Sequence, residues 1–366
     1  MTISPSIVLA GGGTAGHINP MLAIAREVTR QSPDAKILMV GTEDGLETDI
    51  VPQAGYEIAF ISRAPFPRRP NLAAVKFPVK FMQGVQKARQ ILTSSGADVV
   101  VGVGGYVCPP MYIAAQMLSV PVVIHEANAK PGMANVFGAK RAAFVGTAFP
   151  DTKIAQAQHV GMPMRENIES LDRESLREDA RKRLGLDPSL PTLVVTGGSL
   201  GAKSLNDTVE GILSELPQWN FQILHITGRD KSIKTPDGML FEAPRYVQRE
   251  FITSMEDVYA AADLLVVRSG AATVSEVAAV GVPAVFVPLP IGNGEQEFNA
   301  RSLIQSGAGV LVKDAEFTTQ WFVEHIPALL ADANKLRDMS EKSYAQGIRN
   351  AASTMATEVL KAVKHD

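Results

Sequence analysis

Short apolar segments alternate with stretches of helical periodicity along most of the chain. The apolar segments contain no Asp, Glu, Lys or Arg, which is typical of parallel strands covered on both faces. The stretches between them repeat apolar residues at helical spacing. The pattern predicts strand–helix–strand units, and therefore an α/β fold with parallel sheets. The predicted strands are Ile7–Ala10, Ile37–Val40, Val99–Val103, Val122–Ile124, Leu193–Thr196, Ile223–Ile226, Leu264–Val267 and Ala284–Val287.

One local arrangement occurs twice. At Ser6–Val28 and again at Pro191–Leu213, a predicted strand runs into a glycine-rich turn and then a helix. Such a turn presents backbone N–H groups at a helix N-terminus, where the helix dipole favours an anion or a sugar diphosphate. One turn in each half predicts two nucleotide-binding domains that face one cleft.

A second similarity links the two halves. Asp98–Gly105 precedes a helix and the strand after Val120, and Asp263–Gly270 precedes a helix and the strand after Val282. The similarity fits either an internal duplication or the ordinary likeness of Rossmann-type units. We predict two doubly wound domains, 1–163 and 164–344, with a C-terminal helix at 345–366 that packs back onto the first domain.

Composition narrows the class of protein. The 366 residues suffice for about two domains, and the net charge of −3 gives no general sign of nucleic-acid binding. The single Cys108 excludes a disulfide framework and a cysteine metal site. The N-terminus lacks the basic region of a secretory signal, and prolines and glycines interrupt the uncharged stretch between Asp98 and His125. These features predict a soluble cytoplasmic protein.

The first glycine turn allows more than one interpretation. Gly11–Gly16 matches the dinucleotide pattern G-x-G-x-x-G, with Glu43 or Asp44 available as the ribose carboxylate of a dehydrogenase. That interpretation leaves the second turn unused. The second turn, Gly197–Ser204, lacks the glycine before Lys203 that a P-loop requires, which argues against an NTPase.

Polar residues follow several predicted strands. His17 at a helix N-terminus could act as a general base or satisfy the loop backbone. His125–Asn128 ends a buried strand and could contact substrate hydroxyls or stabilise the strand end; a second histidine at zinc spacing is absent. Arg268 suits a diphosphate, and Glu276 suits ribose hydroxyls or the helix dipole alone. Gly292–Asn299 suits sugar hydroxyls or a helix cap.

The segment Phe66–Leu92 mixes basic and apolar residues. It could lie on an anionic membrane surface, or it could be a helix whose apolar side faces the core.

Taken together, the motifs resemble those of the MurG family of bacterial glycosyltransferases. The resemblance covers nearly the whole chain, through GGGTAGHINP, VGVGGY, HEAN, PGMAN, VGMPMR, TGGSLGA, REFI, RSGAATVSE and EQEFNA in this order. It implies a GT-B fold, with two Rossmann-like domains and an active site between them. It also implies a hexosyltransferase at the cytoplasmic face of the cell membrane. In this family N-acetylglucosamine passes from UDP-GlcNAc to the muramyl C4 hydroxyl of undecaprenyl-diphosphate-MurNAc-pentapeptide (lipid I), with inversion, in peptidoglycan synthesis.

The resemblance also implies roles for particular residues, with no cofactor and no metal. His17 would be the base. Gly104, Gly105, Tyr106, His125 and Glu126 would bind the acceptor, and Leu72, Val75, Lys76, Val79 and Lys80 would contact an anionic membrane surface. Cell-wall and division proteins are further expected partners. The donor would contact Thr14, Ala15, Gly16, Asn128, Arg165, Ser199, Ile252, Arg268, Ala271, Ala272, Thr273, Glu276, Gln296 and Asn299.

Two positions depart from the family pattern, and three other functions stay open. Ala15 stands where many relatives have glycine, and Glu295 stands where some have glutamine. A UDP-GlcNAc 2-epimerase of the same architecture would bind the same donor without a lipid acceptor. A dehydrogenase would use only the first glycine turn, and a binding module would use neither for catalysis.

Overall fold

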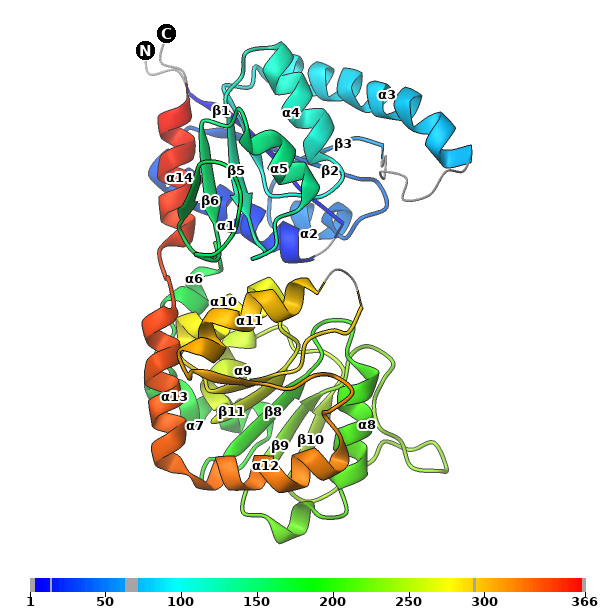
Figure 1. Cartoon of the computed structure of the whole chain (residues 1–366), viewed down its shortest axis with the longest axis vertical. Helices are drawn as coiled ribbons and strands as arrows, with labels where there is room; N and C mark the ends of the chain where they lie inside the picture. The colour runs from blue at the N-terminus through cyan, green and yellow to red at the C-terminus, as the bar shows by residue number, and fades with distance from the viewer. Residues whose placement is uncertain (1–3, 14, 63–71, 292–293, 364–366) are drawn as a thin grey trace. The chain divides into compact units, whose positions relative to one another are not determined.

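A computed structural model describes residues 4–13, 15–62, 72–291 and 294–363, without the side chains of residues 15 and 72–76. The chain forms two compact units (Figure 1). Unit 1 contains residues 1–165 and 350–366, and unit 2 contains residues 166–349. The domain limits proposed from the sequence, at residues 163 and 344, stay a prediction.

Unit 1 is built on a seven-stranded parallel sheet with the strand order β3-β2-β1-β4-β5-β6-β7. The chain reverses its direction of travel across the sheet between β1 and β4, which pair with each other in register from Ile7 with Val99. The strands are β1 (Ser6–Ala10), β2 (Lys36–Gly41), β3 (Glu57–Phe60), β4 (Val99–Gly102), β5 (Val122–Glu126), β6 (Phe144–Thr147) and β7 (Ala157–His159).

Helices cover both faces of this sheet. They are α1 (Ala15–Gln31), α2 (Glu47–Gln53), α3 (Leu72–Ser95), α4 (Cys108–Met117), α5 (Met133–Ala139) and α14 (Ala351–Ala362). Alternate residues of β1 enter different cores: Ile7 and Leu9 pack with residues of α1 and α14, and Val8 and Ala10 pack with residues of α3 and α4. This two-sided burial explains why the strands are continuous apolar runs in the sequence.

Unit 2 repeats the plan with six parallel strands in the order β10-β9-β8-β11-β12-β13. The strands are β8 (Thr192–Thr196), β9 (Gln222–Ile226), β10 (Tyr246–Arg249), β11 (Leu264–Val267), β12 (Ala284–Phe286) and β13 (Gly309–Leu311). The helices are α6 (Glu166–Glu169), α7 (Arg173–Leu184), α8 (Lys203–Ile212), α9 (Met255–Ala261), α10 (Ala271–Val280), α11 (Glu295–Gln305), α12 (Thr319–Ala331) and α13 (Ala333–Gln346), with a 3₁₀ turn at Leu216–Gln218.

The structure confirms the predicted fold class of two doubly wound parallel sheets. All eight predicted strands are present. The segments Asp98–Gly105 and Asp263–Gly270 contain β4 and β11, which hold equivalent places beside β1 and β8. The two halves are therefore alike in topology as well as in sequence.

The C-terminal helical pattern is divided in the structure. Helix α13 ends at Gln346 in unit 2, and α14 begins at Ala351 in unit 1, where Figure 1 draws it as the last red helix. Gln31 of α1 donates a hydrogen bond to the Ser353 carbonyl and accepts one from Thr357. Helix α14 is thereby attached to unit 1 by polar contacts as well as by apolar packing.

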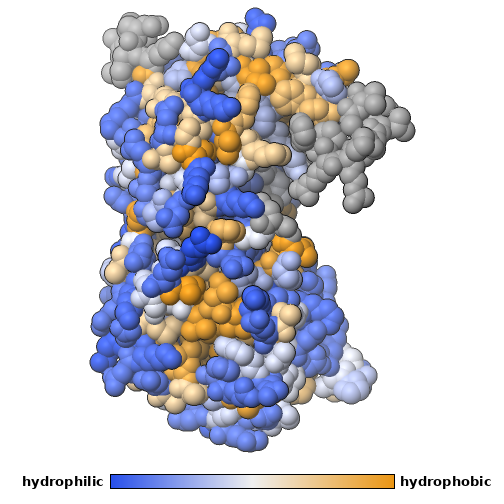
Figure 2. All heavy atoms as spheres, viewed as in Figure 1, coloured by the Kyte–Doolittle hydropathy of each residue, from blue (hydrophilic) through white to orange (hydrophobic). Residues whose placement is uncertain are grey.

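The surface is mixed in character. On the face shown in Figure 2, hydrophobic side chains gather in patches among hydrophilic ones, and a broad patch lies in the lower half of the view. Among the helices of the described residues, none combines the length and the apolar character that a membrane crossing requires.

Candidate active site

In unit 1, two glycine-containing turns lie at the carboxyl ends of the neighbouring strands β1 and β4. Parallel sheets bind ligands at this kind of position, where the strand order reverses. Gly104 and Gly105, after β4, have φ angles of +102° and +91°. A Cβ atom on Gly105 would lie 3.0 Å from the Gly12 carbonyl oxygen, so glycine allows the two turns to approach each other.

His17 lies between these turns. Its Nδ1 atom is 3.1 Å from the carbonyl oxygen of Gly12. A carbonyl can only accept a hydrogen bond, so Nδ1 carries a proton, and in the neutral form of the ring the lone pair lies on Nε2. The Nε2 atom would be 3.1 Å from a Cβ on Gly104, which places it against the second turn. The geometry therefore suits a proton acceptor at this position.

Glu47, the first residue of α2, is a contact of the first turn that the sequence did not reveal. Its carboxylate is fully buried and accepts hydrogen bonds from the N–H and hydroxyl of Thr42 and from the N–H of Gly13. Burial raises the pKa of this carboxyl, but hydrogen bonds from the N–H groups of Thr42, Gly13 and Glu47 itself outweigh burial and hold the pKa below its usual value.

This carboxylate argues against the dehydrogenase interpretation of Gly11–Gly16. The N–H of Gly13 is already bonded to Glu47, so a pyrophosphate at that N–H would meet a negative charge. Glu43 and Asp44, the two candidates for a ribose carboxylate, are exposed on the loop before α2.

At the end of β5, the predicted acceptor residues His125 and Glu126 are buried. The Nε2 of His125 donates to the Gly161 carbonyl, and burial lowers the pKa of His125 to about 4, so the ring is neutral at pH 7. Glu126 accepts hydrogen bonds from the N–H groups of Asn128 and Gly132. Its burial raises its pKa despite these bonds. Glu126 thus orders the loop that carries Asn128, whereas His125 holds Gly161, which follows β7.

Asn135 of α5 is a further residue that the sequence analysis missed. Its Nδ2 donates to Glu126 and to the His125 carbonyl, and its Oδ1 accepts from the hydroxyl of Tyr112. The Nδ2 would also lie 3.6 Å from a Cβ on Gly104. Asn135 therefore links the loop after β5 to the turn after β4.

Cys108 is a buried structural residue. Its thiol contacts the carbonyl oxygens of Ala10 and Gly104, and burial raises its pKa to about 11. The group is a neutral thiol at pH 7 and joins the ends of β1 and β4 rather than acting as a nucleophile.

In unit 2, the equivalent edge is formed by the loops after β8 and β11. Ser199 is exposed in the glycine loop after β8. In the same loop a Cβ on Gly201 would lie 2.0 Å from the Thr227 carbonyl oxygen, so only glycine fits there. After β11, Ala271, Ala272 and Thr273 begin α10 and are half-buried, which leaves the N-terminus of this helix available to an anion.

Arg268 connects several of these loops. Its guanidinium forms an ion pair with Asp314 at 2.5 Å, and it donates hydrogen bonds to Ser204 and to the carbonyls of Val287 and Pro288. Arg268 is only 9% exposed. Most of its donors are thus bonded within the protein, so the group fixes the loops around the predicted diphosphate site.

The other predicted donor residues of unit 2 also contact the protein. Glu276 accepts a hydrogen bond from the Tyr259 hydroxyl at 2.6 Å. The side-chain oxygen of Gln296 accepts from the Leu289 N–H, and the buried amide of Asn299 donates to the Ser269 carbonyl. Ile252 is half-buried in the loop between β10 and α9. The structure places these residues on loops and helices at the carboxyl edge of the sheet.

Some predicted positions lie apart or outside the described part of the chain. Thr14 and the side chains of Ala15, Leu72, Val75 and Lys76 are not among the described residues. Gly16 is exposed in the first turn of α1, and Arg165 is half-buried at the end of the first segment of unit 1. Val79 and Lys80 are exposed on α3.

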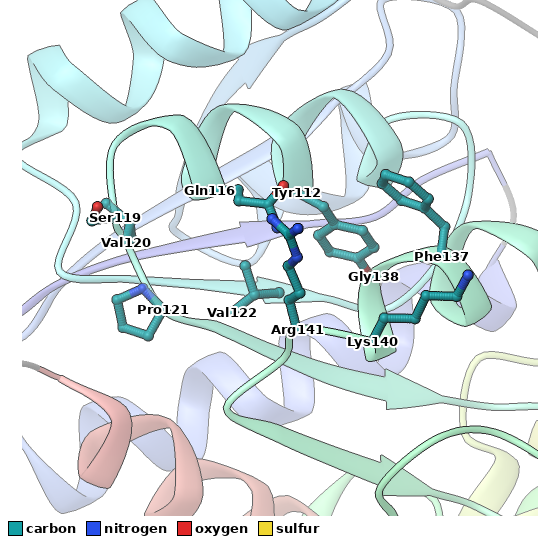
Figure 3. A pocket seen from close by; sticks show the side chains of 10 residues that line it. All are labelled: Tyr112, Gln116, Ser119, Val120, Pro121, Val122, Phe137, Gly138, Lys140 and Arg141. Atoms are coloured by element: carbon teal, nitrogen blue, oxygen red, sulfur yellow. The ribbon is translucent and has the colours of Figure 1, made fainter.

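A cavity lies elsewhere in unit 1, between α4 and α5 (Figure 3). It is lined by Tyr112, Phe137, Lys140 and Arg141 together with residues 119–122. Residues 119–122 lead into the amino end of β5, whereas parallel sheets place substrates at the carboxyl ends. The cavity is therefore separate from the candidate site. In the part of the chain that the structure describes, no group of three or more His, Cys, Asp or Glu residues could hold a metal ion.

Comparison with known proteins identifies the family. The profile of the glycosyltransferase family 28 N-terminal domain matches residues 7–147, and that of its C-terminal domain matches residues 192–355. The UDP-N-acetylglucosamine--N-acetylmuramyl-(pentapeptide) pyrophosphoryl-undecaprenol N-acetylglucosamine transferase of Paenarthrobacter aurescens is 54% identical over 98% of this chain and 96% of its own length. The chain belongs to the MurG family of glycosyltransferases.

Other relatives agree with this membership. The enzyme of the same name from Streptomyces coelicolor is 44% identical, with 98% of each chain covered. The crystal structure of Acinetobacter baumannii MurG superposes with a TM-score of 0.78 at 28% identity, covering 98% of this chain and 99% of that one. The MurG-family GT-B fold expected from the sequence is thereby confirmed.

The epimerase alternative finds support only at the level of the fold. A UDP-GlcNAc 2-epimerase from Neisseria meningitidis, bound to UDP-GlcNAc, superposes with a TM-score of 0.66 at 14% identity, covering 98% of this chain and all of that one. Such a likeness shows a shared architecture, which hosts more than one activity.

Proposed function

We propose that this chain is the hexosyltransferase that moves N-acetylglucosamine from UDP-GlcNAc to the muramyl C4 hydroxyl of undecaprenyl-diphosphate-MurNAc-pentapeptide. The observation that carries the proposal is the 54% identity, over nearly the full length of both chains, to a relative named for this reaction. His17, which lies between two glycine turns, supplies a ring nitrogen, Nε2, that can accept the proton of the acceptor hydroxyl.

We assign the acceptor and the proton transfer to unit 1. The acceptor hydroxyl attacks the anomeric carbon of N-acetylglucosamine, a new C–O bond forms there, and the bond to the UDP oxygen breaks with inversion. The proton of the hydroxyl passes to Nε2 of His17, which is the nitrogen left free by the bond from Nδ1 to Gly12. The turn at Gly104, Gly105 and Tyr106 would receive the acceptor diphosphate through its backbone N–H groups.

We assign the donor mainly to unit 2. The N-terminus of α10, from Ala271 to Thr273, and the loop at Ser199 would stabilise the UDP diphosphate as negative charge develops on it. Arg268 adds positive charge and holds this edge in place through Asp314 and Ser204. Glu276 and Gln296 would bind ribose and sugar hydroxyls, with Asn299 fixing the turn after β11.

We assign the remaining donor contacts to unit 1. Gly16, Asn128 and Arg165 would complete the donor site, together with Thr14 and Ala15, whose side chains are outside the described residues. Ile252 of unit 2 would read uracil through its backbone. His125 and Glu126 would act on the acceptor indirectly, because both side chains are buried. Glu126 holds the loop after β5, and His125 holds Gly161 after β7.

We also propose peripheral attachment to the membrane through α3. Val79 and Met82 are 63% and 53% exposed on this helix, and Lys80 lies exposed beside them. Apolar side chains next to a basic one suit the surface of an anionic bilayer. A peripheral position would bring the enzyme to an acceptor whose lipid tail stays in the bilayer. Cell-wall and division proteins would be further partners at that location.

The proposed reaction is tested with radiolabelled UDP-GlcNAc and a lipid-linked muramyl-pentapeptide acceptor. We expect label in the butanol phase that depends on the acceptor. Label that stays in the aqueous phase, together with epimerised sugar nucleotide, would instead indicate the epimerase.

The role of His17 is tested in the same assay. We expect His17→Ala to lower turnover by about 100-fold or more, because general-base catalysis contributes about 10²–10⁴-fold. His325→Ala, at an exposed histidine of α12, is the matched control and should turn over normally. A loss of less than about tenfold in His17→Ala, equivalent to about 1.4 kcal/mol in the barrier, would exclude His17 as the essential base.

A further inference from the structure

One peptide group connects Glu47 to His17. The N–H of Gly13 and the C=O of Gly12 belong to the same peptide unit. The N–H donates to Oε2 of Glu47 at 3.0 Å, and the C=O accepts from Nδ1 of His17 at 3.1 Å. In a planar trans peptide these two groups point in opposite directions, so one carboxylate and one imidazole are joined through it.

The backbone around Glu47 closely encloses its carboxylate. Cβ atoms on Gly12, Gly41 and Gly45 would lie 2.2, 2.4 and 2.0 Å from side-chain atoms of Glu47. Three glycines are therefore needed for the backbone to close around one buried side chain. Thr42 binds the other oxygen with its N–H and hydroxyl, which leaves Oε2 directed at Gly13.

This arrangement performs two tasks that a carboxylate bonded directly to a catalytic histidine performs elsewhere. It holds the Gly12 carbonyl toward Nδ1, which keeps the proton on Nδ1 and the lone pair on Nε2. It also places a negative charge one peptide away from the ring, where the charge favours the imidazolium that forms during proton transfer.

We propose that Glu47 is a positioning residue for the transferase reaction, acting on His17 through the Gly12–Gly13 peptide. The inference rests on the proposed role of His17 as the base. It differs from a purely structural role, because it requires Glu47 to affect the chemical step and to do so only when His17 is present.

The first test compares Glu47→Gln with the wild-type enzyme. The glutamine has nearly the same shape but cannot accept hydrogen bonds at both ends, so it would lose the bond to Gly13 or the bonds to Thr42. We expect kcat to fall at least tenfold, while KM for UDP-GlcNAc changes less than about threefold. Glu43→Gln, at an exposed carboxylate of the same loop, is the matched control and should leave kcat unchanged. An unchanged kcat in Glu47→Gln overturns the proposal.

The second test is a double-mutant cycle with His17→Ala. If Glu47 acts through His17, the double variant should be no slower than His17→Ala within about twofold. If the double variant instead shows the product of the two single losses in kcat, Glu47 acts independently of His17 and the proposal is overturned. Absence of transfer by the wild-type enzyme would instead overturn the proposed function.

The third test does not depend on activity, and its decisive result does not depend on the folding of Glu47→Gln. In protein labelled with ¹⁵N-histidine, long-range ¹H–¹⁵N correlation reports which ring nitrogen carries the proton, and His17→Ala assigns the signal. We expect the Nδ1–H form of His17 in the wild-type protein and a mixture of both forms in Glu47→Gln. An Nε2–H form in the wild-type protein overturns the proposal, even if Glu47→Gln does not fold.

Discussion

Buried ionisable side chains in this protein are neutral or charged according to the donors around them. The imidazoles of His125 and His225 are buried with only neutral partners. Burial lowers the pKa of His125 to about 4 and that of His225 to about 3. The Glu47 carboxylate, equally buried, stays charged because backbone N–H groups point at it. Burial alone therefore does not decide the charge of a group.

The two buried histidines predict how stability depends on pH. Their pKa values are near 6.5 in the unfolded chain and lower in the folded one, so the unfolded chain binds more protons below pH 6.5. The contribution of the two neutral histidines to the free energy of unfolding is present above pH 6.5 and is lost as the pH falls toward 4 or 3. Between pH 7 and 5.5 the free energy of unfolding should decrease by about 1 kcal/mol for each histidine.

Urea unfolding of His225→Gln measures this contribution. The variant should lose about 1 kcal/mol less between the two pH values than the wild-type protein does. His325→Gln, at an exposed histidine, should keep the wild-type pH dependence. Equal pH dependence in all three proteins would contradict a neutral buried His225.

The sequence predicted part of the candidate site. Its motifs follow neighbouring parallel strands, so His17 and the turn at Gly104–Gly105 could be expected to lie together, as the structure shows. Glu47 and Asp314 could not be found in this way. Glu47 binds a backbone N–H 34 residues away, and Asp314 pairs with an arginine 46 residues away, and no local pattern marks either partnership.

Among the strands, those inside each sheet were predictable apart from β6, and those at the edges were not. Strands β1, β4, β8 and β11 are apolar and buried on both faces, so their sequences are distinctive. The strands that the sequence analysis missed are β3, β6, β7, β10 and β13, and all except β6 lie at a sheet edge. Edge strands such as β7, which is exposed throughout, carry polar residues that resemble loops.

Helix α14 supports a prediction about packing. Met355 is fully buried in the core with α1. Its sulfur packs closely against Gly146 of β6, since a Cβ atom added to Gly146 would lie only 2.5 Å from it. Met355→Ala should lower the free energy of unfolding by about 2–5 kcal/mol, because it leaves a cavity against the sheet. Urea unfolding measures the loss, with the exposed Lys361→Ala as the control that should change stability by less than about 0.5 kcal/mol. A loss below about 1 kcal/mol would mean that α14 is not a firm part of this core.

The molecule as a whole is also predicted to bind membranes. Val79→Glu and Met82→Glu together place negative charge on the exposed side of α3 and should reduce flotation with anionic vesicles at low salt by at least fivefold. Leu240→Glu, at a 48% exposed residue of unit 2, is the matched control. Equal flotation of both variants, or no flotation of the wild-type protein, would contradict attachment through α3.

The return of the chain to unit 1 has a consequence for biosynthesis. Unit 1 is completed only by residues 350–366, which leave the ribosome after all of unit 2 has been made. Until then, the apolar side chains of α1 and the sheet that later receive Met355, Ala356 and Val359 have no cover. The N-terminal half of the nascent protein would therefore expose an apolar surface while the second half is translated. Such a surface favours aggregation, so we expect chaperones to bind this intermediate.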